Sequence, residues 1–194
     1  MVLVFGAVVA EADILTNGGF ETGDLTGWTL DPPRQNADFP GGGEQQEGAV
    51  AFREIQSYYG DDRDPGHLYQ TVPVPAGDWI VSFSGYAKRY VLGDGFALQP
   101  TWGSMTVELT VDDVVEWSET WAADDTWYNF DYTTPAPVTV AGNLDVHLRW
   151  ETEPGVGSKT FDVVLADGWE LSAVPEPGVL LLGAAGLALL RRRR

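Results

Sequence analysis

Two tyrosines and a lysine alternate along one short stretch of the chain, in a pattern suited to sugar binding. Tyr86, Lys88 and Tyr90 are two residues apart, so on an extended strand their side chains point to one face. Aromatic rings stack on the C–H faces of sugars, and a flanking cation donates hydrogen bonds to hydroxyl groups. We expect a polysaccharide-binding site here, completed by aromatic residues of flanking loops: Tyr58, Tyr59 and Trp102.

The alternative is that these rings form a second layer of core, because a β-sandwich buries many aromatic side chains. The protein would then be a structural matrix protein without a ligand pocket. The two interpretations differ in the exposure of Tyr86 and Tyr90: two buried rings would exclude binding there, and two exposed rings beside a groove would favour it.

The sequence holds none of the motifs that position a nucleophilic serine, a catalytic zinc ion, a phosphate or a dinucleotide. The two histidines, His67 and His147, are isolated in sequence, and we expect His147 to be exposed on the polar face of a strand. Glycoside hydrolysis needs only two carboxylates, for which the candidates are Glu108, Glu116, Glu119 and Glu151. Because 29 acidic residues produce such pairs by chance, we expect no enzymatic activity, with glycoside hydrolysis as the remaining alternative.

Charge and composition limit the partners. The net charge is −18, which excludes nucleic acid as a partner, since binding to phosphates needs clustered Lys and Arg. An acidic surface instead attracts cations such as Ca²⁺. The absence of cysteine removes disulfides and thiolate metal sites.

The elements that must position these residues are β-strands. Apolar and polar residues alternate with a period of two in residues 79–90, 105–111, 128–132, 144–151 and 161–171, with shorter strands expected at 49–52 and 68–72. Turn-rich stretches separate them, and no long amphipathic helix appears. We predict an all-β fold, an antiparallel β-sandwich (jelly roll) over residues 13–172. In the last strand the pattern assigns five residues to the core side: Phe161, Val163, Leu165, Trp169 and Leu171.

The start of this domain resembles the opening of carbohydrate-binding-module-like and galactose-binding-like jelly-roll modules, which begin with an Asn-Gly-x-Phe-Glu-x-Gly segment followed by Gly-Trp. The matching residues are Asn17, Gly18, Phe20, Glu21, Gly23, Gly27 and Trp28. Those modules often end on Asp-Asp-Val-x-Leu, where this chain has Asp167-Gly168-Trp169-Glu170-Leu171. The resemblance spans residues 14–171 and implies a jelly roll with a role in sugar binding.

Glu21 and Asp167 are the candidate metal ligands. The first and last strands of a sandwich commonly lie side by side, and two carboxylates with backbone carbonyls suit a hard cation. In the modules that the chain resembles, a structural calcium lies in this region, so the resemblance implies a structural Ca²⁺ held by these two residues. The alternative is that Glu21 accepts hydrogen bonds from backbone N–H groups of its own turn.

The first residues are consistent with an export signal. Residues 1–10 are nearly all apolar, and Ala10-Glu11-Ala12 fits the small-x-small pattern before a signal-peptidase cut. The basic segment that begins a signal peptide is missing. We therefore expect residues 1–12 to be a truncated signal peptide, the alternative being a buried first strand.

The last residues form a three-part tail, residues 173–194. Val174-Pro175-Glu176-Pro177 is followed by an apolar run, residues 178–190, for which we expect a short hydrophobic helix, and then by Arg191, Arg192, Arg193 and Arg194. Such a cluster is held on the cytoplasmic side of a membrane, although the run is shorter than the roughly 20 residues of a full span. A terminal helix packed on the domain is the alternative.

This tail resembles the PEP-CTERM sorting signal. The resemblance implies an exported protein of a Gram-negative bacterium, held briefly in the inner membrane by the hydrophobic helix. An exosortase-like protease would process it near the Pro-Glu-Pro motif. The product would then reach the cell surface or the extracellular matrix of a biofilm, with exopolysaccharide as a possible partner.

Overall fold

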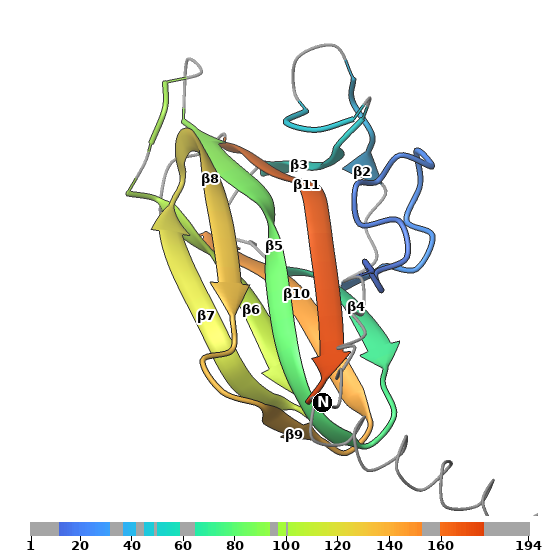
Figure 1. Cartoon of the computed structure of the whole chain (residues 1–194). Helices are drawn as coiled ribbons and strands as arrows, with labels where there is room; N and C mark the ends of the chain where they lie inside the picture. The colour runs from blue at the N-terminus through green and yellow to red at the C-terminus, as the bar shows by residue number, and fades with distance from the viewer. Residues whose placement is uncertain are drawn as a thin grey trace, which may run out of the picture.

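Two antiparallel sheets stack face to face in the computed structural model, which describes residues 12–31, 37–41, 45–48, 50–58, 65–93, 97–99, 101–152 and 160–176. Sheet A has five strands in the order β1 (Thr29–Asp31), β4 (Gly66–Pro73), β10 (Asn143–Thr152), β6 (Gly103–Val111) and β7 (Val114–Ala122). Sheet B has the order β2 (Ala37–Asp38), β3 (Phe52–Tyr58), β11 (Thr160–Pro175), β5 (Gly77–Leu92) and β8 (Asp124–Thr133), with β9 (Val138–Val140) also paired to β5. Figure 1 shows β8, β5 and β11 in one layer and β7, β6, β10 and β4 in the layer behind. The predicted fold class, an all-β antiparallel sandwich, is confirmed.

The core lies between the sheets and is centred on Trp169 of β11. Its indole meets Phe83, Phe130 and Trp28 edge to face, with ring centroids 5.3, 5.4 and 5.5 Å away. Gly85 of β5 makes this packing possible, because a Cβ there would lie 2.6 Å from Cδ1 of Trp169. Such edge-to-face contacts add to the stabilisation from burial of the rings.

A buried ion pair joins two neighbouring strands of sheet B on their inward side. Arg89 of β5 donates from Nε and Nη2 to the two carboxylate oxygens of Asp162, at 2.9 and 2.6 Å, and both side chains are almost fully buried. Arg89 Nη1 also donates to the backbone carbonyls of Ser104 and Glu151 in sheet A. The guanidinium group therefore links the two sheets, and its charge is compensated by the paired carboxylate.

The predicted inward face of β11 is correct for only half of the strand. Trp169 and Leu171 belong to the core cluster as expected. Before them, Val164 and Ala166 belong to that cluster, whereas Val163 and Leu165 are buried outside it. The reason is a bulge between Asp167 and Glu170, where Gly168 has φ +58°. One extra residue shifts the alternation by one position. A period-two pattern drawn through the whole strand cannot show this shift.

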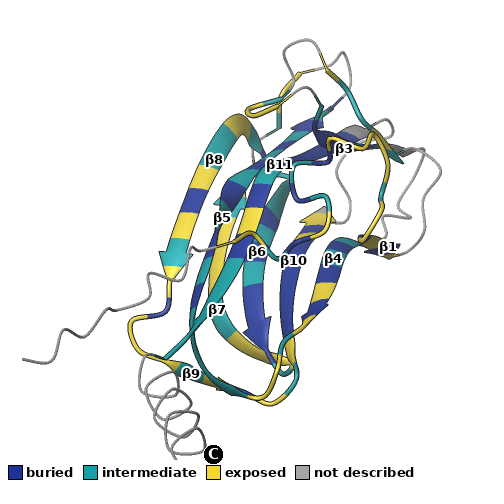
Figure 2. Cartoon of the chain, turned by 45° about the vertical axis from the view of Figure 1, so that its right-hand side comes forward, coloured by how far each residue is buried: buried dark blue, intermediate teal, exposed yellow. Residues whose placement is uncertain are grey.

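Strand β7 was not predicted from the sequence. It lies at the edge of sheet A, and many of its residues are exposed. Edge strand β8 of sheet B was predicted, and Figure 2 shows exposed residues along it. The β7 residues that pack against the core, Trp117 and Trp121, are four positions apart, so this strand lacks the period-two apolar alternation that marks a strand.

The described chain ends in the sheet. Ala173, Val174 and Pro175 pair with Val81, Ile80 and Trp79 of β5, and the Glu176 N–H donates to the Asp78 carbonyl. The first residues of the predicted tail thus lie beside β5. Within the described residues no helix is long and apolar enough to cross a membrane. The predicted hydrophobic helix, Pro177, Arg191–Arg194 and the predicted signal peptide up to residue 11 lie outside the described residues.

Candidate functional site

The outward side of sheet A carries a continuous set of polar side chains, which we call the polar face of sheet A. Directly opposed residues of antiparallel strands share a face, so the register of β4, β10 and β6 places them in three rows. The rows are Thr71, Asp145 and Thr110; Tyr69, His147 and Glu108; and His67, Arg149 and Thr106.

Two histidines meet in the middle of this face. His67 Nε2 lies 2.9 Å from His147 Nδ1, and the Tyr69 ring stacks on His67 with centroids 4.7 Å apart. His147 is only 8% exposed, so the expectation that it is solvent-exposed was wrong. It contacts the rings of His67 and Tyr69 on β4 and the Thr110 hydroxyl on β6, which the sequence of β10 alone could not show.

Both histidines are held in the neutral form. Burial and then the charge of Arg149 lower the pKa of His67 to about 4, and the same two causes lower the pKa of His147. A neutral imidazole has one donor and one acceptor nitrogen. Each ring can therefore accept a hydrogen bond from one neighbour and donate one to the next.

The direction of these hydrogen bonds follows from Arg149, which can only donate. Its Nη1 lies 3.3 Å from His67 Nδ1, so the His67 proton is on Nε2 and is donated to His147. His147 Nε2 in turn lies 3.3 Å from the Thr110 hydroxyl, which donates to Asp145. This series of hydrogen bonds ends on the Asp145 carboxylate, which also accepts a hydrogen bond from Thr71. The polar groups are therefore held in fixed orientations.

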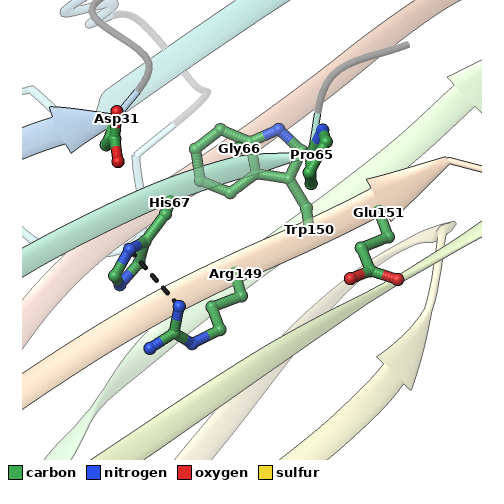
Figure 3. Close-up of a pocket in the computed structure, with 7 residues that line it drawn as sticks. All are labelled: Asp31, Pro65, Gly66, His67, Arg149, Trp150 and Glu151. Carbon is green, nitrogen blue, oxygen red and sulfur yellow. Dashed lines mark hydrogen bonds between the residues drawn. The ribbon is translucent and has the colours of Figure 1, made fainter.

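A cavity of about 560 Å³ opens beside this face (Figure 3). Figure 3 shows His67 of β4 and Arg149 of β10 turned toward each other at its wall. Gly66 leaves room for the Trp150 indole, because a Cβ there would lie 2.1 Å from the ring. The lining residues are Asp31, Pro65, Gly66, His67, Arg149, Trp150 and Glu151. Its volume is in the range of small-ligand sites, roughly 300 to 1,000 Å³.

The predicted sugar-binding residues lie on the other sheet. Tyr86, Lys88 and Tyr90 share the outward side of β5 in sheet B, and all three are half-buried. Lys88 Nζ contacts Asp125 at 2.6 Å and lies 5.6 Å from the centre of the Tyr90 ring. The three residues therefore share one face of the strand, as the sequence predicted.

The three flanking aromatic residues add little to that cluster. Trp102 is half-buried and packs against Gly93 near the start of β6. Tyr58 ends β3, which is separated from β5 by β11, and its side chain is outside the described part, as is Tyr59. Sequence reasoning missed the residues that do face β5 from β8: Trp127, Asn129 and Asp131.

Asp167 is the best-placed of the predicted metal ligands. Its side chain is fully buried, and Oδ2 accepts the N–H groups of Gln46 and Glu47 at 2.6 and 2.7 Å. Its Oδ1 has no hydrogen-bond partner among the described residues. Burial raises the pKa of Asp167, and the negative charge of Glu21 adds to this.

Glu21 lies close to the same loop. Its Oε1 is 3.4 Å from the Val50 nitrogen, and a Cβ on Gly48 would collide with it. An unpartnered buried oxygen beside a second carboxylate fits a hard cation. No cluster of three His, Cys, Asp or Glu side chains that could hold a metal occurs in the described residues; backbone carbonyls, side-chain amides and water are the other oxygen ligands that Ca²⁺ takes.

The four glutamates considered for glycoside hydrolysis have different surroundings. Glu108 receives a hydrogen bond from Arg149 Nε at 2.5 Å, and Glu116 receives one from the Tyr132 hydroxyl at 3.1 Å. Glu119 is exposed on edge strand β7. Glu151 lies four residues along β10 from His147, the partner of Glu108, a separation of about 13 Å at about 3.3 Å per residue. Glycosidase pairs are closer, at roughly 5 to 9.5 Å.

No family model matches the sequence, and no curated protein matches it either. Solved structures do share its fold. The carbohydrate-binding module TmCBM61, solved in complex with β-1,4-galactotriose, aligns with a TM-score of 0.55 at 17% identity and covers 85% of this chain and 99% of its own.

Two further structures carry the same fold inside longer chains. The enzymatically active domain of bacteriophage CBA120 tailspike protein 4 has a TM-score of 0.53 at 10% identity, over 84% of this chain and 21% of its own. The arabinose-bound α-L-arabinofuranosidase MgGH51 has a TM-score of 0.50 at 11% identity, over 87% and 27%. These similarities establish a shared jelly-roll fold.

Proposed function

We propose that this chain is a non-catalytic carbohydrate-binding module that holds a polysaccharide against the polar face of sheet A. The observation that carries this proposal is the cavity beside Arg149 and His67, bordered by side chains whose hydrogen bonds are already directed. It is supported by the fold shared with a module solved with a bound galactotriose. Glycoside hydrolysis finds no support in the spacing of Glu108 and Glu151.

The chemistry of the cavity suits a polyhydroxylated ligand. Arg149 uses Nε and Nη1 within the face and has further N–H groups for ligand hydroxyls. Asp31 and Glu151 supply acceptors, while Pro65 and the ring of His67 line the cavity with carbon atoms that sugar C–H groups can contact. A sugar provides all three kinds of partner within one residue.

Affinity electrophoresis in gels containing neutral and acidic polysaccharides tests this function. The native protein should be retarded by at least one polysaccharide, and Arg149→Ala and Asp31→Ala should each reduce the retardation. Val114→Ser is the control, because Val114 is 69% exposed at the start of β7, away from the cavity residues. Unchanged mobility of the native protein across the panel would contradict the proposal.

We further propose that a structural Ca²⁺ is bound by Glu21 and Asp167. When bound, the ion supplies positive charge to the buried carboxylate. Asp167 itself holds Gln46 and Glu47 against β11 through their N–H groups. Glu21 Oε1 accepts a longer hydrogen bond, 3.4 Å, from the Val50 N–H group. These two residues would then connect the opening segment, the 45–50 segment and the last strand.

We also propose that the protein is exported and sorted by an exosortase-like protease, with residues 1–12 and 173–194 as signals. The support is the sequence of the tail, with its Pro-Glu-Pro motif, apolar run and four arginines. Fractionation of native cells tests this. Removal of residues 177–194 keeps Val174, Pro175 and Glu176 beside β5 and should abolish delivery to the cell surface or matrix. Cytoplasmic retention of the full chain would contradict it.

A further inference from the structure

The outward side of sheet B is hollowed along the middle of β5. The register places β11 and β8 on either side of it, with Ser172 and Thr133 beside Ser82 in one row. Glu170 and Asp131 flank Ser84 in the next. Serine side chains are short, so the second row is lower at Ser84 than at its flanks, Glu170 and Asp131. The sequence therefore builds a trough on this side of the sandwich.

Two cavities in this trough adjoin one another. The larger, of about 460 Å³, reaches from Asp13 to Glu170, and the smaller, of about 230 Å³, includes Tyr86 and Asn129. Both are lined by Ser84, Asp131 and Glu170. Because they share these three residues, they form one elongated groove. Its length follows β5, and the half-buried ring of Tyr86 lies at one end.

The groups that line the groove form hydrogen bonds, and those that carry a charge are all negative. Hydroxyls come from serine and threonine, an amide from Asn129, and carboxylates from Asp13, Glu47, Asp131 and Glu170. No Lys, Arg or His is among the described lining residues. Carboxylates accept charge-assisted hydrogen bonds from sugar hydroxyls, whereas they repel the anionic groups of acidic glycans. The polar face of sheet A differs, because it presents Arg149.

We propose that this groove is a second glycan-binding site, specific for an uncharged polysaccharide. Sheets A and B face each other through the core, so their outward sides lie on opposite sides of the sandwich (Figure 1). A molecule with a ligand on each side links two polysaccharide chains. This cross-linking rests on the proposed function of sheet A, but binding in the groove of sheet B does not.

The test uses the full chain with soluble β-1,4-galactan, xyloglucan and polygalacturonate as probes. Arg149→Ala should keep residual affinity for at least one neutral polymer and none for polygalacturonate. Adding Asp131→Asn or Ser84→Trp to it should remove that residual affinity, by about tenfold or more, as expected for loss of charge-assisted hydrogen bonds. Asp113→Asn is the matched control, since it removes a carboxylate from the exposed turn between β6 and β7.

Cross-linking is measured as growth of polysaccharide particles in dynamic light scattering. The native protein should enlarge them, while Arg149→Ala and Asp131→Asn should each bind without enlarging them. If Arg149→Ala abolishes binding to all three polymers, the second site is refuted and the proposed function stands. If Arg149→Ala binds as the native protein does and only Asp131→Asn abolishes binding, the groove stands and the site on sheet A is refuted. If the native protein binds none of them, both fail.

Discussion

His67 Nε2 lies 2.9 Å from His147 Nδ1, and the two imidazole rings stack with their centroids 5.1 Å apart. Arg149 donates to one end of this pair, and the Thr110 hydroxyl lies at the other. Protonation of either histidine would turn an acceptor nitrogen into a donor, so that nitrogen could no longer accept the hydrogen bond from its neighbour. The hydrogen-bond order of the polar face thus depends on two neutral histidines.

Acid should destabilise the fold through His67. Its pKa of about 4 in the folded protein lies below the ordinary 6.5, so between these values the unfolded chain binds the extra proton. Stability from this group is fully present above pH 6.5 and is lost as the pH falls toward about 4. The melting temperature of His67→Gln should therefore fall less than that of the native protein over this range. Parallel curves for the two proteins would contradict the prediction, and Val114→Ser should follow the native curve.

Calcium should raise the melting temperature. An ion that binds only the folded state stabilises it by about 2.7 kcal/mol at a concentration 100 times its dissociation constant. Asp167→Asn should remove the effect, because it removes the charge of the buried carboxylate. Asp113→Asn, on the exposed turn, should retain it. No shift at millimolar Ca²⁺ in the native protein would exclude the site.

Arg89→Ala should be strongly destabilising. It leaves Asp162 buried without the guanidinium that bonds both of its carboxylate oxygens, and breaking a buried pair in this way costs about 3 to 5 kcal/mol. The double variant Arg89→Met with Asp162→Leu should be more stable than Arg89→Ala, since no buried charge remains. Urea denaturation measures the free energy of unfolding of both variants. A loss below 1 kcal/mol in Arg89→Ala would show that the ion pair contributes little to stability.

Gly66→Ala should displace Trp150 beneath the cavity of sheet A. The new Cβ would lie 2.1 Å from the indole, and overpacking of this kind costs about 1 to 3 kcal/mol. We expect a lower melting temperature and weaker glycan retardation. Gly19→Ala is the matched control, because the nearest atom to its Cβ would be 3.6 Å away. Equal melting temperatures for the two variants would contradict this packing.

A chain cut after Ser172 should be less stable than one cut after Glu176. Residues 173–175 pair with Trp79, Ile80 and Val81 at the end of β5, so the shorter chain loses these pairs and leaves part of that strand unpaired. Thermal melting of the two truncated proteins side by side makes the comparison. Identical melting temperatures would show that these pairs contribute nothing to the domain.

The polar side chains of the two candidate sites were only partly foreseeable. The alternation of Tyr86, Lys88 and Tyr90 along β5 depends on neighbouring residues alone, so the sequence predicted their shared face. Their partners Asn129 and Asp131 come from β8, about 40 residues later. Strand register sets which residues stand opposite one another, and a single sequence does not reveal it.

The sequence by itself determined the antiparallel sandwich and most of the inward-facing residues, because burial on one face of a strand imposes a period of two on the chain. It also placed Glu21 and Asp167 as a candidate metal pair. Only the tertiary structure decided that His67 and His147 meet, that a bulge at Gly168 reverses the alternation of β11, and that serines beside longer residues hollow sheet B. These features arise from contacts between strands distant in sequence and from one inserted residue, which local patterns do not encode.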